Sequence, residues 1–439
     1  MTPPISDLDQ YRDDVERFLA LPRLAADPTF AHLFSAEAVV GLDTDEGPNA
    51  QRRRALARFA VEGHLRGAGA EEMAELEERL RAPLVTGSPA GAVSLRDVDP
   101  LLAAEPDRAR RRELHTARLR AIDSHLRDLV SDAALRRADA ARALGATSAA
   151  ALAAQMCGLD LSQLAADAEH MLGGSDDLAA RSLDRAAQAG LGISAADLDS
   201  ADLPRLTRAP HVESDLPAGA VASAVARTRE LLGSRDETTW RSSIEGVSRA
   251  LEMLRGTGAA LARAGVSPRL PVEARRLGDP ALVQAHALLL EGLLAEPEWL
   301  RRVLGAADPE PIAAMAATIR LLTARTAAAG VMGLCGGDIV ALMSRALGLA
   351  WPSEMSIGAE LGSLEPADEL RGRMLAAALR VHLRETFGER WFLEGGAASL
   401  LRELWLEGGD LDAQTLAREL GSPGLDPMSL VAEAGERLG

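Results

Sequence analysis

The spacing of apolar residues is the feature that most constrains what this chain can fold into. In segment 107–130 (DRARRRELHTARLRAIDSHLRDLV) they recur at i, i+3 and i+4, which predicts one long helix with Asp107 at the positive end of its dipole. Apolar residues make up 47% of the 439 residues and aromatic residues only 3%, so Ala, Leu and Val must fill the core. Such a core favours closely packed helices over a β-sandwich. We therefore predict an all-α, mostly helical fold with at most a few short strands; residues 92–95 could be a strand or an extended link.

The charge balance argues against nucleic acids and membranes as partners. The net charge is −17, from 65 acidic and 48 basic residues, whereas the phosphate contacts of a nucleic-acid or lipid surface need a basic face. All 48 basic residues are arginine, which excludes any lysine-dependent catalysis.

The cysteines and the N-terminus indicate a cytoplasmic protein. Cys157 and Cys335 are far apart in sequence, form no CxxC motif and imply no disulfide framework. The first residues, MTPPISDLDQYRDDVERFL, are acidic and amphipathic, unlike a signal peptide. No uncharged apolar run approaches the ~18 residues that a membrane span needs. We therefore expect a soluble protein of the cytoplasm.

The histidines do not form the simplest helical zinc site. That site needs two histidines at i and i+4, so that two imidazole nitrogens converge on the ion. No two histidines of this chain have that spacing, and the closest pair, His115 and His125, lies ten residues apart. We expect neither a metal nor another cofactor. The eight histidines are His32, His64, His115, His125, His170, His211, His286 and His382.

A stretch reading RGTGAAL precedes a Leu-Gly-Asp turn and a second helical segment, QAHALLLEGLL. This order resembles the active-site helices of the M3 (oligopeptidase F / thimet-like) zinc peptidases, whose motif reads roughly HE-x-G-H-A-L, followed by the same turn and a second helix. Gly258, Ala260 and Leu261 match the scaffold positions of the first helix. The C-terminal segment 374–421 resembles the tail of that family as well.

The same resemblance implies that the chemistry of the family has been lost. Arg255 and Ala259 fall where the two histidine ligands belong, and Gly256 falls where the catalytic glutamate belongs. Gln284 takes the place of the third ligand. The family also uses a tyrosine near the C-terminal half, and the one tyrosine here is Tyr11. We therefore expect no zinc metallopeptidase activity and no catalytic residue of the family's kind.

The resemblance implies a two-lobed, M3-peptidase-like helical body with a central cleft. Residues 1–105 would form an N-terminal helical region, and 106–217 a helical lobe with the long helix and a proline-rich crossing. Residues 218–439 would form the degenerate peptidase-like lobe. Segment 231–250 has no alternating strand pattern, so the edge strand that pairs with a bound peptide in the family is expected to be missing.

The former metal position is the candidate ligand site. There the guanidinium of Arg255 would face Gln284 and Glu291, which lie seven residues apart and share a helix face. Such a group could bind a carboxylate with two parallel hydrogen bonds. The alternative is that Arg255 is solvated and pairs with Glu252 at i−3. His286 lies on the other side of its helix and is expected to be a packed or surface histidine.

Two functions of different class follow. In the first, the protein is a catalytically inactive pseudopeptidase, a binding or scaffold protein for a peptide, small molecule or partner enzyme in the inter-lobe cleft. In the second, it is a metal-free enzyme of a biosynthetic pathway that reuses the cleft, with Arg255, Gln284 or Glu291 orienting the substrate. The combined loss of ligands, base and groove strand favours the first. The preserved helical scaffold, which would still enclose a cavity, keeps the second open.

Overall fold

Helices make up almost all of the structure. The computed structural model describes residues 8–21, 28–42, 50–88, 91–233 and 245–439. Within these ranges the only sheet has two short antiparallel strands, β1 (Val85–Ser88) and β2 (Gly91–Val93). The predicted all-α fold is confirmed, and the extended segment expected at 92–95 begins in β2.

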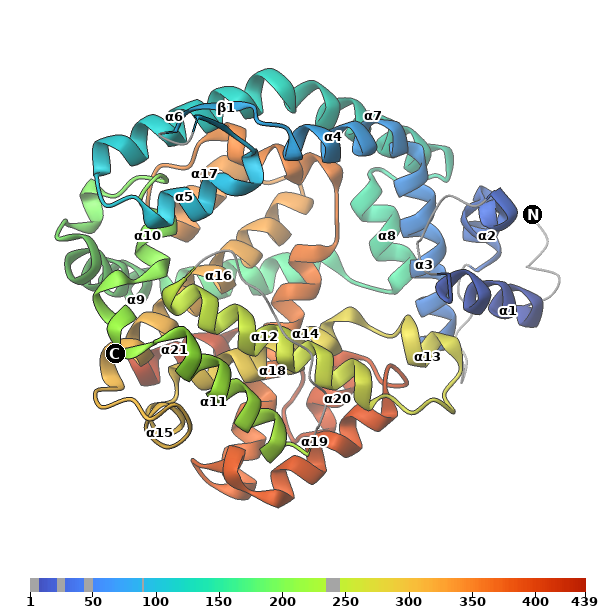
Figure 1. The fold of residues 1–439 in the computed structure, drawn as a ribbon. Coiled ribbons are helices and arrows are strands. Elements are labelled where there is room, and N and C mark those ends of the chain that lie inside the picture. Colours follow the sequence, from blue (N-terminus) through green and yellow to red (C-terminus); the bar gives the residue numbers. More distant parts are fainter. Residues whose placement is uncertain (1–7, 22–27, 43–49, 89–90, 234–244) are drawn as a thin grey trace.

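The N-terminal helices form an arch over one side of the molecule, with α4, α6 and α7 at the top of the view in Figure 1. Their Ala, Leu and Val side chains make two smaller apolar cores. The helices of this part are α1 (Leu8–Leu19), α2 (Ala36–Gly41), α3 (Ala50–Ala68), α4 (Ala70–Arg81), α5 (Val98–Ala104), α6 (Arg108–His125), α7 (Arg127–Ala143) and α8 (Ala149–Cys157).

The single helix predicted over 107–130 is wrong, because the chain forms α6 and α7 with a break at Leu126. Hydrogen bonds still cross the break, from Leu126 N to Ile122 O (2.9 Å) and from Val130 N to Leu126 O (3.0 Å). The side chain of Leu126 is buried in the apolar core beneath the arch. The residues Leu114 and Ile122 of α6 and Val130 of α7 belong to the same core, so both helices keep their apolar side chains on it. Asp107 caps α6 as expected, since its carboxylate accepts a hydrogen bond from Ala109 N.

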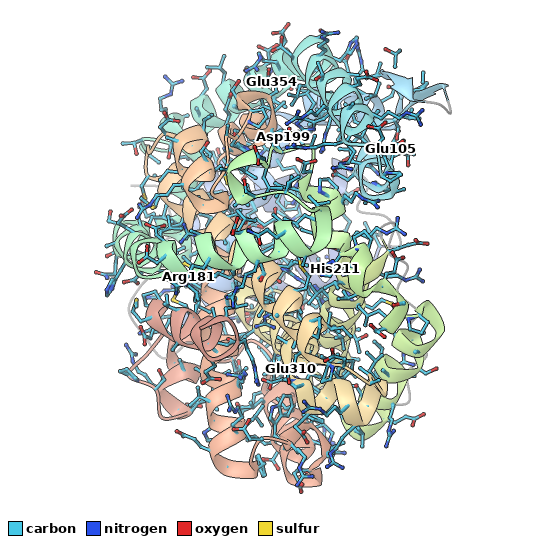
Figure 2. The ribbon with its side chains drawn as sticks, turned by 90° about the vertical axis from the view of Figure 1, so that its left-hand side faces the viewer. Glu105, Arg181, Asp199, His211, Glu310 and Glu354 are labelled. Atoms are coloured by element: carbon cyan, nitrogen blue, oxygen red, sulfur yellow. The ribbon has the colours of Figure 1, made fainter. Side chains whose placement is uncertain are left out.

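Helix α9 (Leu161–Leu191) crosses the middle of the molecule. In Figure 2 this helix, which carries Arg181, has Asp199 and Glu105 above it and Glu310 below it. Gly158, which ends α8, has a φ of 67°, a conformation that glycine adopts without strain. After α9 come the short helix α10 (Leu203–Arg208) and α11 (Ala218–Leu231).

The C-terminal helices build the largest core, in which α14 packs against both α12 and α18. Gly258 allows the close approach of α12 to α14, because a Cβ atom there would lie 2.4 Å from the carbonyl oxygen of His286. The helices are α12 (Gly246–Gly265), α13 (Val272–Arg276), α14 (Pro280–Gly292), α15 (Pro297–Trp299), α16 (Glu310–Leu334), α17 (Ile339–Leu347), α18 (Glu365–Phe387), α19 (Gly395–Glu407), α20 (Ala413–Glu419) and α21 (Pro427–Leu438).

Helix α16 is a core helix. Among the described helices it alone is long and apolar enough to cross a bilayer by length and composition. However, 78% of its most apolar stretch is buried inside the protein. The cytoplasmic location stays a prediction.

Two predictions about organisation are not tested. The missing edge strand was expected within 231–250, and residues 234–244 of this segment lie outside the described residues. On either side, α11 ends at Leu231 and α12 begins at Gly246. The boundaries 1–105, 106–217 and 218–439 also stay predictions.

Candidate functional site

Arg255 lies where α12 meets α14 and α18. Its Nη2 donates a hydrogen bond to Oε1 of Gln284 at 2.9 Å and pairs with the carboxylate of Glu369 on α18. Its Nη1 lies 3.6 Å from Oε2 of Glu291, the other site residue on α14. The structure therefore brings together the three residues that the sequence singled out, and adds Glu369.

The guanidinium of Arg373 is the fifth member of this group of side chains. Arg373 Nη2 lies 2.8 Å from Glu369, and its Nη1 lies 3.7 Å from Glu291. The Arg373 side chain is only 3% exposed, and that of Glu291 only 6%. We call Arg255, Gln284, Glu291, Glu369 and Arg373 the Arg255 network. Its two arginines and two glutamates balance in charge, and together they join three helices.

The charges of the network stabilise one another. Burial alone would lower the pKa of Arg255, but the carboxylates of Glu369 and Glu291 outweigh it and hold that pKa above its ordinary value. Burial would raise the pKa of Glu369, but Arg373 and Arg255 outweigh it and hold that pKa below its ordinary value. The ionised forms of Arg255 and Glu369 are therefore favoured in the folded protein.

The partners of Arg255 decide between the two interpretations of this residue. Its contacts lie on α14 and α18, and the described part of the chain shows no pairing with Glu252. A role of Arg255, Gln284 and Glu291 in binding a ligand stays a prediction. Sequence reasoning missed Glu369 and Arg373, whose i, i+4 spacing on one helix was the available signal.

Two solved structures share this arrangement of helices. A putative oligoendopeptidase F from Bacillus anthracis str. Ames is similar with a TM-score of 0.58 and 12% identity, over 97% of this chain and 81% of that chain. The chain has an M3-peptidase-like fold. A second putative oligoendopeptidase F structure gives a TM-score of 0.63 and 12% identity, over 97% and 82% of the two chains. No protein-family model and no curated protein matches the sequence.

The zinc ion that this fold implies does not fit the residues at the matched positions. Zinc is held by imidazole, thiolate or carboxylate groups. At these positions Arg255 brings a positive charge, Ala259 has no donor atom, and the amide oxygen of Gln284 already accepts from Arg255. The nearby carboxylates of Glu291 and Glu369 are paired with arginines. No group of three or more His, Cys, Asp or Glu suited to a metal occurs among the described residues.

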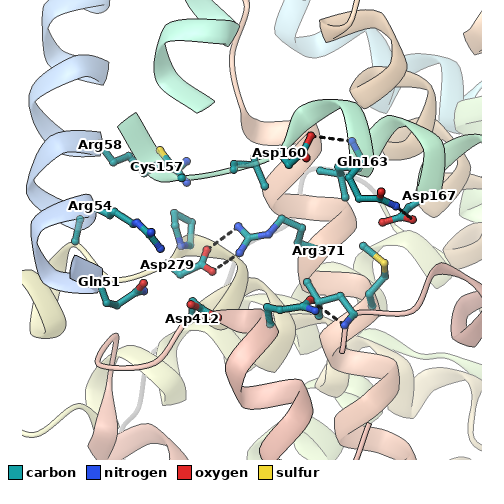
Figure 3. Close-up of a pocket in the computed structure, with 18 of the residues that line it drawn as sticks. Gln51, Arg54, Arg58, Cys157, Asp160, Gln163, Asp167, Asp279, Arg371 and Asp412 are labelled. Atoms are coloured by element: carbon teal, nitrogen blue, oxygen red, sulfur yellow. Dashed lines mark hydrogen bonds and ion pairs between the residues drawn. The ribbon is translucent and has the colours of Figure 1, made fainter. Parts of the chain in front are cut away.

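A cavity of about 530 Å³, which we call the inter-lobe cavity, lies between helices from the N-terminal part of the chain and helices from the C-terminal part (Figure 3). Side chains from α3 and from the α8–α9 turn line one wall, and residues of α14, α18 and α20 line the other. None of Arg255, Gln284 and Glu291 lines it. The Arg255 network and this cavity are therefore separate places in the structure.

Two of the three arginines in the inter-lobe cavity are bound to carboxylates. Arg371 pairs with the buried Asp279, and Arg58 pairs with the buried Asp368, with Nη1–Oδ1 distances of 2.9 Å in both pairs. Arg54 differs, since it has no hydrogen-bond or ion-pair partner within the described ranges and its Nε is buried. Figure 3 shows Arg54 reaching from α3 toward the Asp279–Arg371 pair.

The thiol in the cavity is not activated. Burial raises the pKa of Cys157 to about 12, an effect that the nearby Arg58 only partly offsets. Asp160 and Asp412 cap α9 and α20, each accepting a hydrogen bond from a backbone N–H of its helix. These groups build the walls of the cavity together with Asp167, which accepts a hydrogen bond from Gln163 at 3.0 Å. Of the three arginines that line the cavity, Arg54 is the one without a partner in the described ranges.

His286 is a packed histidine, as the sequence predicted. It is 5% exposed, and its ring meets that of Trp405 edge to face at 6.0 Å. Burial lowers the pKa of His286 to about 4, whereas an unfolded histidine titrates near about 6.5.

This shift predicts a pH dependence of stability. Between about pH 6.5 and about pH 4 the unfolded chain binds a proton at His286 and the folded chain does not, so acid favours unfolding. We expect the free energy of unfolding to fall by roughly 3 kcal/mol over this range through this residue. Urea unfolding at several pH values would show a flatter profile for His286→Gln. The exposed His170→Gln should leave the profile unchanged, and equal slopes for all three proteins would contradict the assignment.

Proposed function

We propose that this protein is a non-hydrolytic pseudopeptidase, a binding protein that holds a carboxylate-bearing peptide or small molecule in the inter-lobe cavity. The observation that carries the proposal is the Arg255 network. It fills the matched metal position with a charge-balanced group that joins α12, α14 and α18. A partner protein could present such a carboxylate from a chain terminus.

The pairing of the side chains within the Arg255 network supports the loss of peptide hydrolysis. A zinc peptidase needs a metal-bound water and a general base beside it. Gly256, at the position matched to that base, has no side chain, and a metal at Arg255 would meet a guanidinium. To bind a ligand carboxylate, Arg255 would have to give up Glu369 or Glu291, both largely buried.

Arg54 supports a carboxylate as the group that is bound. An arginine presents a planar fork of N–H donors that matches a carboxylate, and an unpaired one in a cavity is a natural anchor. The cavity volume of about 530 Å³ falls within the range of about 300–1,000 Å³ typical of small-molecule sites.

The cavity gives less support to a metal-free biosynthetic enzyme. Nucleophilic or acid–base catalysis needs a group with a pKa tuned toward neutrality. The Cys157 thiol is shifted away from its reactive thiolate form, and the carboxylate of Asp279 is engaged by Arg371 and by two backbone N–H groups. A binding role therefore agrees better with these side chains.

Ligand-induced thermal shifts test the proposal. Trialanine with a free C-terminus should raise the unfolding midpoint of the wild-type chain, and trialanine amide should not. Arg54→Ala should remove the response, because it deletes the free guanidinium. Arg66→Ala is a matched control, since Arg66 is an exposed arginine on the same helix.

Arg255→Ala separates the two candidate positions. Because Arg255 does not line the inter-lobe cavity, this variant should keep the response to trialanine, measured from its own lower midpoint. A response that survives Arg54→Ala and disappears with Arg255→Ala would contradict the proposal and return the binding site to the former metal position. Release of alanine from trialanine by the wild-type protein would contradict the non-hydrolytic role.

A further inference from the structure

A second cavity, of about 570 Å³, lies on the other side of the turn that precedes α14, and we call it the Trp405 cavity. Its walls come from the end of α12, from α13, α14 and α19, and from the loop after α19. Among its lining residues only Asp279 also lines the inter-lobe cavity. Asp279, which pairs with Arg371 and caps α14, is thus part of the wall between the two cavities.

The inner walls of the Trp405 cavity are apolar. Leu282 of α14, Leu404 of α19 and Leu411 line it beside the indole of Trp405. The backbone closes one end, because Gly278 and Gly409 approach so closely that a Cβ atom on Gly278 would lie 2.4 Å from the Cα of Gly409. A hydrocarbon or aromatic group placed here would be removed from water, which favours its binding.

Two buried polar groups in this wall lack partners. His286 and Trp405 are 5% and 4% exposed, and both line the cavity. Neither the Nδ1 of His286 nor the Nε1 of Trp405 has a hydrogen-bond partner in the structure as described. An orphaned buried polar group usually has a partner that is not part of the protein, such as water or a ligand. Both groups therefore keep a hydrogen-bonding capacity that no described residue uses.

The mouth of the cavity is positively charged. Arg263, Arg275 and Arg276 all line it, together with one exposed carboxylate, that of Glu407. Arg275 pairs with Glu16, and Arg276 donates a hydrogen bond to the carbonyl of Leu19. Arg263 is exposed and has no partner among the residues that the structure describes. An anionic group at the mouth would therefore meet one free guanidinium and two more nearby.

We propose that the Trp405 cavity binds a small amphipathic carboxylate, with its apolar body against Trp405 and the leucines and its carboxylate at Arg263. Apolar lining residues and a guanidinium unpaired among the described residues are each what such a molecule needs. This site is separate from the one proposed for the inter-lobe cavity, and the two proposals stand or fall independently.

Octanoate is the probe for this site, with octanamide and octylammonium as neutral and cationic analogues of similar size. Binding is followed by tryptophan fluorescence and by isothermal titration calorimetry. We expect octanoate to bind at least tenfold more tightly than octanamide, and octylammonium to bind least. Trp405→Phe should remove most of the ligand-induced fluorescence change, because the indole of Trp405 lines the cavity.

Arg263→Gln should weaken octanoate binding about tenfold and leave octanamide binding unchanged. Arg269→Gln is the matched control, since Arg269 is an exposed arginine that follows α12 and does not line the cavity. Leu411→Trp, which would fill the space, gives a second variant if its thermal midpoint shows that it folds, and it should abolish binding.

Three results would overturn the proposal. The first is equal affinity for octanoate and octanamide. The second is octanoate binding that Arg263→Gln does not change. The third is octanoate binding that is lost in Arg54→Ala, because that would place the fatty acid in the inter-lobe cavity.

Discussion

Glu369→Gln should lower the free energy of unfolding by about 3–5 kcal/mol, the cost typical of breaking a buried ion pair from one side. The substitution keeps the volume and removes one negative charge from the Arg255 network. Arg373, 3% exposed, would keep only the more distant Glu291 at 3.7 Å, and Arg255 would keep Glu291 at 3.6 Å. Two buried or half-buried guanidiniums would then share one carboxylate. Urea unfolding at pH 7 measures the change.

Glu252→Gln is the control for this prediction. Glu252 is exposed on α12 and lies three residues before Arg255, so it was the alternative partner in the sequence. We expect its substitution to change stability by less than about 0.5 kcal/mol, as for most surface positions. If Glu252→Gln destabilised the protein as much as Glu369→Gln, Arg255 would not be held by the network.

Arg325→Met should be equally destabilising, by about 3–5 kcal/mol. Arg325 of α16 is 1% exposed, and its three guanidinium nitrogens donate five hydrogen bonds that join α16 to α9 and to the end of α17. Methionine fills a similar volume but donates no hydrogen bond, so all five bonds are lost, although Asp176 keeps Arg345 and Leu172 O keeps Ser175 as donors. The acceptors are the carbonyl oxygens of Ala346, Leu172 and Arg345, the hydroxyl of Ser175 and the carboxylate of Asp176.

Two further variants define the cause of the Arg325 effect. Arg325→Lys keeps the charge but not the planar fork, so it should cost less than Arg325→Met and still be clearly destabilising. Arg181→Met, at an exposed position on α9, should change the midpoint of urea unfolding little. An unfolding midpoint for Arg325→Met close to that of Arg181→Met would show that the buried hydrogen bonds do not hold these helices together.

Much of the fold and part of the Arg255 network could be predicted from the sequence. Helical spacing predicted the all-α body. The resemblance in the order of motifs placed Arg255 beside Gln284 and Glu291, although α13 lies between the two helices that carry them. Glu369 could not be placed in the same way. It lies 114 residues from Arg255, and such a separation leaves no local pattern that would pair the two.

The cavities were harder to predict than the helices. Arg54 follows two other arginines in a helical pattern, and the sequence alone cannot tell the one that faces a cavity from those that face water. The bend at Leu126 was missed because no proline or glycine marks it, and the curvature of the core beneath decides it. Both features depend on tertiary packing, which residue spacing does not record.

The zinc content of the protein tests the central claim most directly. After dialysis against zinc and removal of free metal, we expect elemental analysis to give well below one zinc per chain, because Arg255, paired with Gln284 and Glu369, stands at the position matched to a metal ligand. One zinc per chain would contradict this account, provided that Gln284→Ala or Glu291→Ala removed it.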